Sequence, residues 1–187
     1  MQPRLSASVA LALLLTASAA AASTRVVQGS ATAKSYNEVW RKWDNVPLAV
    51  YVDDSSNAYI MGTDGGIIKA RGFLSQSDTS KVLALLRKSQ EWVATAQAKK
   101  LEVTKELGRF MRRSDFSENG VALQFFAANE GRQTDVILTL VDFDNQFYRL
   151  ELYLDPSQVA ALIGLLERVP ETISELKKHE AAAASLE

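Results

Sequence analysis

The chain has no cysteine and only one histidine, His179, close to its C-terminus. Without cysteine it can form no disulfide, no thiolate metal site and no Cys–His catalytic pair. A single histidine near the chain end also excludes ordinary Ser–His catalysis and zinc sites built from several Cys and His ligands. No G-x-S-x-G, phosphate-loop or dinucleotide-binding motif occurs. These absences leave carboxylate chemistry, or binding without catalysis, and they predict no cofactor and no metal.

An excess of either charge is also lacking, since 21 Lys and Arg residues stand against 22 Asp and Glu residues, for a net charge of −1. Proteins that bind nucleic acid usually carry a basic face. The balance therefore argues against nucleic acid as a partner. Beyond the N-terminal region no segment is long and apolar enough to span a membrane, so we expect no membrane span in the mature chain.

The first residues have the layout of a secretory signal peptide. Arg4 is followed by an apolar run centred on Val9 to Leu15 and then by small residues from Ala17 to Ser23. The apolar run is too short for a helix across a bilayer of about 30 Å, although an uncleaved anchor remains the alternative. We predict a signal peptide over 1–22, cleaved near Ala20 to Ala22, and export to the periplasm or the extracellular space.

The rest of the chain, about 165 residues, suits one compact domain that is stable without disulfides. We predict a flexible lead over 23–34, a single α+β domain over 35–180 and a frayed tail over 181–187. The oligomeric state cannot be inferred from these features.

Residues 35–44 show the spacing of a short amphipathic helix. Ser35 and Glu38 have the spacing of a capping box, and the apolar residues that follow recur at i, i+3, i+4 and i+7. These apolar residues are Tyr36, Val39, Trp40 and Trp43. The tryptophans either attach the helix to the core or line a ligand groove, and Trp40 and Trp43 are therefore candidate ligand-binding residues.

From Pro47 the period changes to that of strands. Three runs rich in β-branched and aromatic residues, 47–54, 57–62 and 66–74, are separated by turn residues, which predicts antiparallel hairpins. A helix should follow, with Ser75 as its N-cap. Its apolar stripe comprises Val82, Leu85, Leu86, Ser89, Trp92, Val93 and Ala96.

Residues 100–110 allow two interpretations. They either extend this helix to a length unusual in globular proteins or form a charged edge strand, which we favour. Arg109, Arg112 and Arg113 form a small basic cluster here. Arg109 and Arg112 are the second pair of candidate ligand-binding residues.

Three more strands are predicted over 120–128, 134–142 and 146–154, the middle one apolar enough to be central. A helix should begin at the N-cap Asp155, with Pro156 in the first helical position. Its buried stripe comprises Val159, Leu162, Ile163, Leu166 and Val169, and Pro170 should stop or kink it.

Residues 72–88 and 152–168 share an outline of strand, cap and helix. Four positions are identical: Leu74 and Leu154, Ser77 and Ser157, Leu85 and Leu165, Leu86 and Leu166. An internal duplication of βββα-like units, about 35–100 and 101–178, explains the agreement; convergence of two capped helices is the alternative. In coarse element order alone, this arrangement resembles the double-unit folds of the Whirly and PUR nucleic-acid-binding families, whose motifs the chain lacks.

Two groups of carboxylates lie at predicted turns, one around Asp53 and one around Asp142, Asp144 and Asn145. The spacing from Asp53 to Asp64 is similar to that of an EF-hand loop. Ala58 replaces the required glycine and Asp64 the bidentate glutamate. We therefore interpret both groups as structural turns.

The sequence as a whole predicts an exported, non-enzymatic α+β protein that binds another protein or a small ligand through its sheet or through a cleft between two units. A carboxylate-dependent hydrolase is the first alternative. A nucleic-acid-binding module of Whirly-like or PUR-like architecture is the second.

Overall fold

The computed structural model describes residues 24–65, 69–113, 118–142 and 148–185. Nine strands occur in this part of the chain: β1 (Thr24–Val26), β2 (Ala31–Asn37), β3 (Lys42–Asp53), β4 (Ala58–Thr63), β5 (Lys69–Leu74), β6 (Val103–Arg113), β7 (Glu118–Ala128), β8 (Gln133–Asp142) and β9 (Tyr148–Leu154). Three helices accompany them: α1 (Gln76–Lys99), α2 (Pro156–Glu167) and α3 (Val169–Ala184). The predicted α+β class with antiparallel strands is confirmed.

All pairings in the sheet are antiparallel, and the strand order is β5-β4-β3-β2-β9-β8-β7-β6, with β1 paired to β3 outside this path. The sheet curls strongly, and as a result β5, at one end of the strand order, lies close to β7 near the other end. A Cβ on Gly72 would lie 2.5 Å from Val121 Cγ2 and 2.7 Å from the Gly120 carbonyl oxygen. Such a close crossing of two strands requires glycine at position 72.

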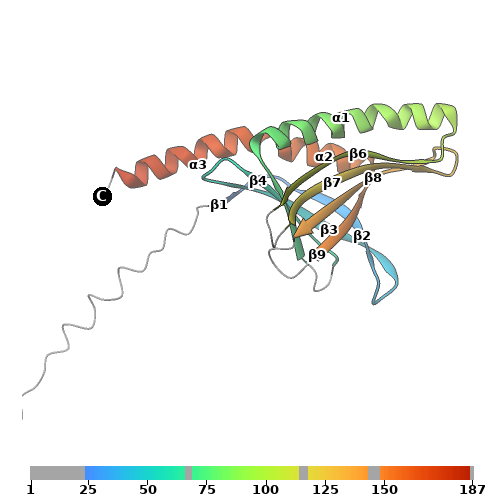
Figure 1. Cartoon of the computed structure of the whole chain (residues 1–187), viewed down its shortest axis with the longest axis horizontal. Helices are drawn as coiled ribbons and strands as arrows, with labels where there is room; N and C mark the ends of the chain where they lie inside the picture. Colours follow the sequence, from blue (N-terminus) through green and yellow to red (C-terminus); the bar gives the residue numbers. More distant parts are fainter. Residues whose placement is uncertain (1–23, 66–68, 114–117, 143–147, 186–187) are drawn as a thin grey trace, which may run out of the picture.

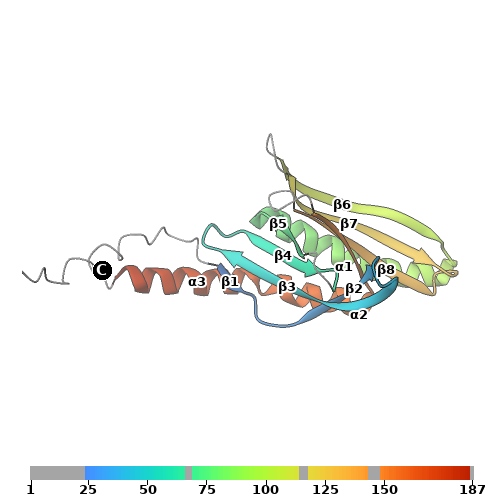
Figure 2. The same cartoon turned by 90° about the horizontal axis from the view of Figure 1, so that it is seen from below.

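The helices lie along one side of the curled sheet, and the hairpin of β2 and β3 extends to the other side (Figures 1 and 2). A single main core lies between the helices and the inner faces of the strands. Leu138 and Leu140 of β8 and Leu152 of β9 are at most 1 % exposed. Strand β8 is interior, as its apolar sequence predicted.

Both predicted helix starts are confirmed. The Ser75 side chain accepts a hydrogen bond from the Asp78 backbone N–H at 3.2 Å. Asp155 and Gln158 form a reciprocal capping box at the start of α2. Helix α2 ends before Arg168, two residues ahead of Pro170, and α3 begins at Val169. Because α3 extends to Ala184, residues 181–184 of the predicted frayed tail are helical.

The helix predicted over residues 36–44 is wrong. Strand β2 includes Tyr36, a turn covers 38–41, and β3 begins at Lys42. In β2, Ala31, Ala33, Ser35 and Asn37 alternate as buried positions with more exposed ones, which is the period of a strand with one covered face. Small inner residues made this alternation inconspicuous beside the helical spacing of the aromatic residues.

The structure also shows the conformation of residues 24–34 and of residues 103–113. Strand β1 and the first residues of β2 fall within the predicted flexible lead, and residues 103–113 form strand β6, as we favoured, rather than a helix extension. No helix among the described residues is long and apolar enough to cross a membrane. The predicted signal peptide, Asp144 and Asn145 lie outside the described residues.

Candidate binding groove

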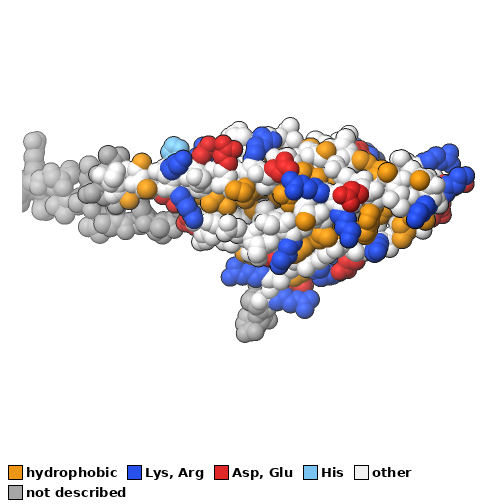
Figure 3. Space-filling view, turned by 90° about the horizontal axis from the view of Figure 1, so that it is seen from above, with side chains coloured by type: hydrophobic (Ala, Val, Ile, Leu, Met, Phe, Trp, Pro, Cys, Tyr) orange, Lys and Arg blue, Asp and Glu red, His pale blue; other side chains and the backbone are white. Residues whose placement is uncertain are grey.

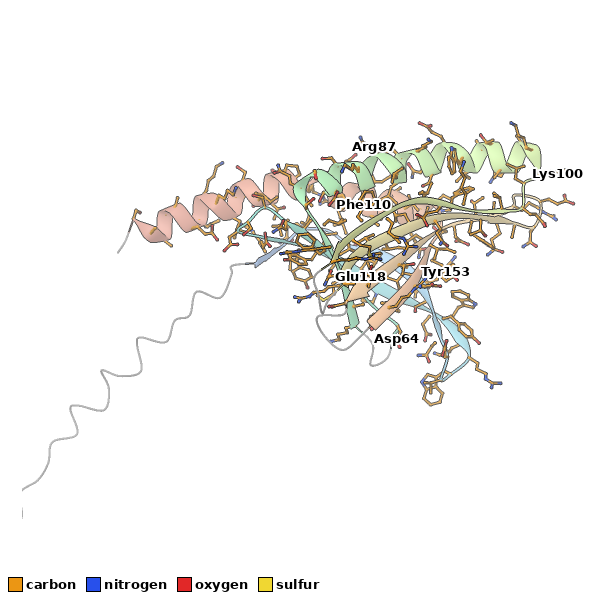
Figure 4. The ribbon with its side chains drawn as sticks, viewed as in Figure 1. Asp64, Arg87, Lys100, Phe110, Glu118 and Tyr153 are labelled. Atoms are coloured by element: carbon orange, nitrogen blue, oxygen red, sulfur yellow. The ribbon has the colours of Figure 1, made fainter. Side chains whose placement is uncertain are left out.

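A groove opens where strands β2 and β9 separate. The two strands are joined at one registered pair, Lys34 with Tyr153. Beyond that pair, β2 continues into the hairpin with β3 while β9 stays beside β8. The space between them has a volume of about 480 Å³ and is lined by Ser35, Tyr36, Asn37, Glu38, Val39, Asp64, Arg149, Leu150, Glu151 and Tyr153. Tyr153 and Asp64 lie on the side of the sheet away from helix α1 (Figure 4).

Tyr36 and Tyr153 form an aromatic wall of the groove, and Trp43 packs against both rings. Trp43 lies opposite Tyr36 in the hairpin, with ring centroids 5.4 Å apart. On its other side it contacts Tyr153 edge-on at 4.9 Å. Such edge contacts hold the rings in place while leaving parts of their faces open. Tyr36 and Trp43 are 44 % and 54 % exposed, so the cluster belongs to the surface.

The turn beyond this wall presents two large apolar side chains to solvent, since Val39 is 82 % and Trp40 73 % exposed. The Asn37 side chain holds the turn by accepting hydrogen bonds from the backbone N–H groups of Val39 and Trp40, each at 3.1 Å. Arg41 completes the turn with a φ of 51°. The exposure of Trp40 thus follows from an ordered turn.

The groove carries more negative than positive charge. Glu38, Asp64 and Glu151 line it, against Arg149 alone. Arg149 forms an ion pair with Glu151 at 2.9 Å. Burial raises the pKa of Tyr153, with Glu151 and Asp135 adding to the rise, so its hydroxyl stays protonated and can donate a hydrogen bond. The groove therefore offers aromatic faces, a hydroxyl donor and a net charge of −2 from its lining side chains.

The four predicted ligand-binding residues do not come together. Trp40 and Trp43 belong to the hairpin beside the groove, whereas Arg109 and Arg112 lie on β6, beyond β9, β8 and β7 in the strand order. Arg109 forms a 3.5 Å ion pair with Glu106, and the Arg112 guanidinium lies 5.3 Å from the Phe73 ring centroid. The candidate residues thus lie on two separate surfaces of the molecule.

Asp53, at the turn between β3 and β4, has a structural role. The Asp53 carboxylate accepts hydrogen bonds from the Asn57 backbone N–H at 2.8 Å, the Asn57 amide at 3.0 Å and the Tyr59 hydroxyl at 3.1 Å. Burial and this carboxylate raise the pKa of Tyr59. In the described part of the chain, no three acidic or histidine side chains gather as a metal site would require.

Asp142, expected at a turn, is buried at the end of β8 and connects three strands. Its carboxylate accepts hydrogen bonds from the Asn119 amide and the Arg71 backbone N–H, both at 3.3 Å. Asn119 in turn accepts a 2.8 Å hydrogen bond from the Phe73 backbone N–H. These two side chains attach strand β5 to the end of the β7–β8 hairpin.

No protein-family model matches the chain, and neither the curated proteins nor the solved structures include a match. The groove must therefore be interpreted from its own chemistry.

Sequence reasoning missed most of the groove-lining residues. Arg149, Glu151 and Tyr153 alternate along β9, so the period of a strand places them on one face. Nothing local indicated that this face lies beside Tyr36, because β2 and β9 are far apart in the chain.

Proposed function

We propose that this is an exported, non-enzymatic binding protein whose groove between β2 and β9 takes a small aliphatic amine. One observation carries the proposal: an ordered aromatic wall stands beside three carboxylates and a single arginine in a groove of about 480 Å³. A groove of this size suits a small molecule.

Each feature of the groove favours a protonated amine. Aromatic faces attract cations, by about 0.5–2 kcal/mol for one contact. Glu38 adds carboxylate oxygens, the natural partners of an ammonium group. The aliphatic part of the ligand would cover the apolar surface of Val39, which is now in water. A phosphate or a nucleic-acid backbone would meet a net negative lining instead.

The same carboxylates argue against the hydrolase alternative. A general acid needs a carboxyl group that is desolvated enough to stay protonated. Glu38 and Glu151 are exposed, and Glu151 is already paired with Arg149. To bind a cationic ligand, the carboxylates need only their negative charge.

Tryptophan fluorescence tests the proposal. In a Trp92→Phe background the remaining tryptophans, Trp40 and Trp43, both belong to the hairpin. Diaminobutane should change their emission saturably at physiological salt, whereas butanediol, its uncharged analogue, should not. Glu38→Gln or Tyr36→Leu should each weaken binding about tenfold, equivalent to ~1.4 kcal/mol.

The control variant is Glu171→Gln, which removes an exposed carboxylate from the first turn of α3. It should bind diaminobutane as the parent does. Equal responses to the diol and the diamine, or equal losses in the control variant, would remove the support for an amine site.

Export is the second part of the proposal, and it rests on the charged, apolar and small-residue regions of residues 1–22. Edman sequencing of protein from a host's exported fraction should give a start near Ser23. Exported protein that still begins at Met1 would contradict cleavage.

We also propose that the chain arose by duplication of a strand-rich unit ending in a helix. The four antiparallel strands β2–β5 precede α1, and the four strands β6–β9 precede α2, with the short β1 as an additional strand before the first unit. The pattern of buried and exposed residues over 71–80 recurs position by position over 151–160. If duplication is correct, residues 31–99 should superpose on 103–167 with their caps, Ser75 and Asp155, aligned. A superposition that misaligns the caps would favour convergence.

A further inference from the structure

The two edge strands of the sheet, β5 and β6, differ in how their outward backbone groups are bound. At one end, the backbone N–H groups of Arg71 and Phe73 in β5 are bound by the side chains of Asp142 and Asn119. At the other end, β6 pairs with β7 on one side, and no described strand pairs with its other side. Figure 2 shows β6 along the outer margin of the molecule. Half of the backbone groups of an edge strand point outward, which makes such a strand a template for another.

The positive charge of β6 favours an acidic partner. Its sequence contains Lys105, Arg109, Arg112 and Arg113 against Glu106 alone, a net charge of +3. Pairing two copies of this strand would place this charge against itself, which is unfavourable. Lys88, in the middle of α1, lies over the Trp92 ring, and Lys100, the C-cap of α1, pairs with Glu130. Cationic side chains gather at the C-terminal end of α1 (Figure 3).

An apolar groove adjoins the start of β6. It has a volume of about 280 Å³ and is lined by Trp92, Thr95, Ala96, Leu101, Val103, Lys105 and Phe125. Leu101 and Val103 are 38 % and 37 % exposed, so an apolar side chain of a partner could cover them. The groove lies beside the strand edge, where an added strand would place every second side chain.

The Trp92 ring is already surrounded. Lys105 and Lys88 place their ammonium groups 4.8 Å and 5.4 Å from its centroid, and Phe125 contacts it edge-on at 5.6 Å. Binding of single-stranded nucleic acid depends on open ring faces on which bases stack. The surroundings of Trp92 therefore favour a peptide over a nucleic acid.

We propose that β6 is a docking edge for an extended acidic peptide, which adds a strand along Val103–Arg113 and places one apolar side chain in the adjoining groove against Leu101 and Val103. The bulge between Glu106 and Gly108 interrupts the register. The added strand would therefore pair on either side of this bulge. This site is separate from the groove between β2 and β9.

Fluorescence anisotropy with a labelled peptide that alternates Glu and Val around a central Phe tests the proposal. It should bind at least about tenfold more tightly than the same peptide with Lys in place of Glu, and it should weaken when salt rises from about 0.02 M to about 0.2 M. N-methylation of alternate peptide groups, which removes the ladder donors, should abolish binding.

The variant Lys105→Glu/Arg109→Glu should lose at least about tenfold in affinity, the equivalent of ~1.4 kcal/mol, whereas the matched control Arg41→Glu, in the hairpin turn, should retain it. An unchanged thermal melt would show that the double variant folds. Equal binding of the acidic and basic peptides, or of the N-methylated peptide, would overturn the proposal. Tighter binding of single-stranded oligo(dT) than of the acidic peptide would also overturn it. So would a dimer of the parent protein in analytical ultracentrifugation whose stability changes in the double variant, because β6 would then pair with a second copy.

Discussion

Asp155 connects the end of strand β9 to the start of helix α2. Its carboxylate accepts hydrogen bonds from the backbone N–H groups of Ser157 at 3.0 Å and Gln158 at 3.1 Å, and it pairs with Lys34 at 3.3 Å. Burial acts to raise the pKa of Asp155, but hydrogen bonds from the Ser157 hydroxyl and the Gln158 backbone N–H, together with Lys34, outweigh it and lower the pKa below its ordinary 3.8. The charged form is therefore the one that stabilises the fold.

Replacing this cap should have different effects at different pH. Asp155→Ala should lower the free energy of unfolding at neutral pH by about 1 kcal/mol, the usual cost of losing an N-cap. Asp155→Asn should retain most of that stability, because the amide oxygen still accepts. Urea denaturation measures both changes.

The sign of the pH effect follows from the lowered pKa. The stability due to the charge is complete above the unfolded value of about 3.8 and is lost as pH falls through the lower folded pKa. The parent should therefore lose more stability than Asp155→Asn between pH 5 and pH 2. Parallel losses in the two proteins would show that this carboxylate does not carry the effect.

At the scale of elements, α2 followed directly from the sequence while the β2–β3 hairpin did not. The cap, the proline at the first position and the leucine stripe of α2 are local signals that agree with one another. Between 31 and 43, two periods overlap: bulky residues recur at helical spacing, while Ala31, Ala33 and Ser35 alternate as a strand. Pairing with β3 and β9 favoured the strand, and no local pattern reports such pairing.

The helix stripe makes a quantitative prediction. Leu166 is 1 % exposed in the main core, so Leu166→Ala should lower the free energy of unfolding by about 2–5 kcal/mol. Val39→Ala, at an 82 % exposed position, should change it by less than about 0.5 kcal/mol. Chemical denaturation of the two variants provides the comparison. Similar values for both would mean that α2 does not pack as described.

At the scale of the whole molecule, the curl of the sheet depends on contacts that no sequence pattern indicated. Asn119 and Asp142 hold β5 against the β7–β8 hairpin. Strands β3–β5 and β7–β9 were largely predictable from the sequence, whereas β1 and β2 were not, and which strands cross depends on side chains at their ends. The groove has the same origin, because β2 and β9 meet at Lys34 and Tyr153 and then diverge.

Removing the Asn119 side chain, which binds β5 to the β7–β8 hairpin, should destabilise that end of the sheet. Asn119→Ala leaves the Phe73 backbone N–H without its 2.8 Å acceptor at a partly buried position, where the loss should be at or below the low end of the about 1–3 kcal/mol that a fully buried unsatisfied donor costs. Hydrogen exchange should show faster exchange at Phe73 and little change in α2. A uniform increase across the protein, or none at Phe73, would contradict this local role of Asn119.

The central claim is that the space between β2 and β9 binds a small amine, and mapping of backbone amide chemical shifts tests it most directly. Titration of the ¹⁵N-labelled protein with diaminobutane should move the amide signals of residues 35–39 and 149–153, which line the groove, with one common saturation curve. Signals of β6 should stay in place, and butanediol should move none of these signals. Absence of saturable shifts at 35–39 and 149–153, or saturable shifts confined to other strands, would contradict the account.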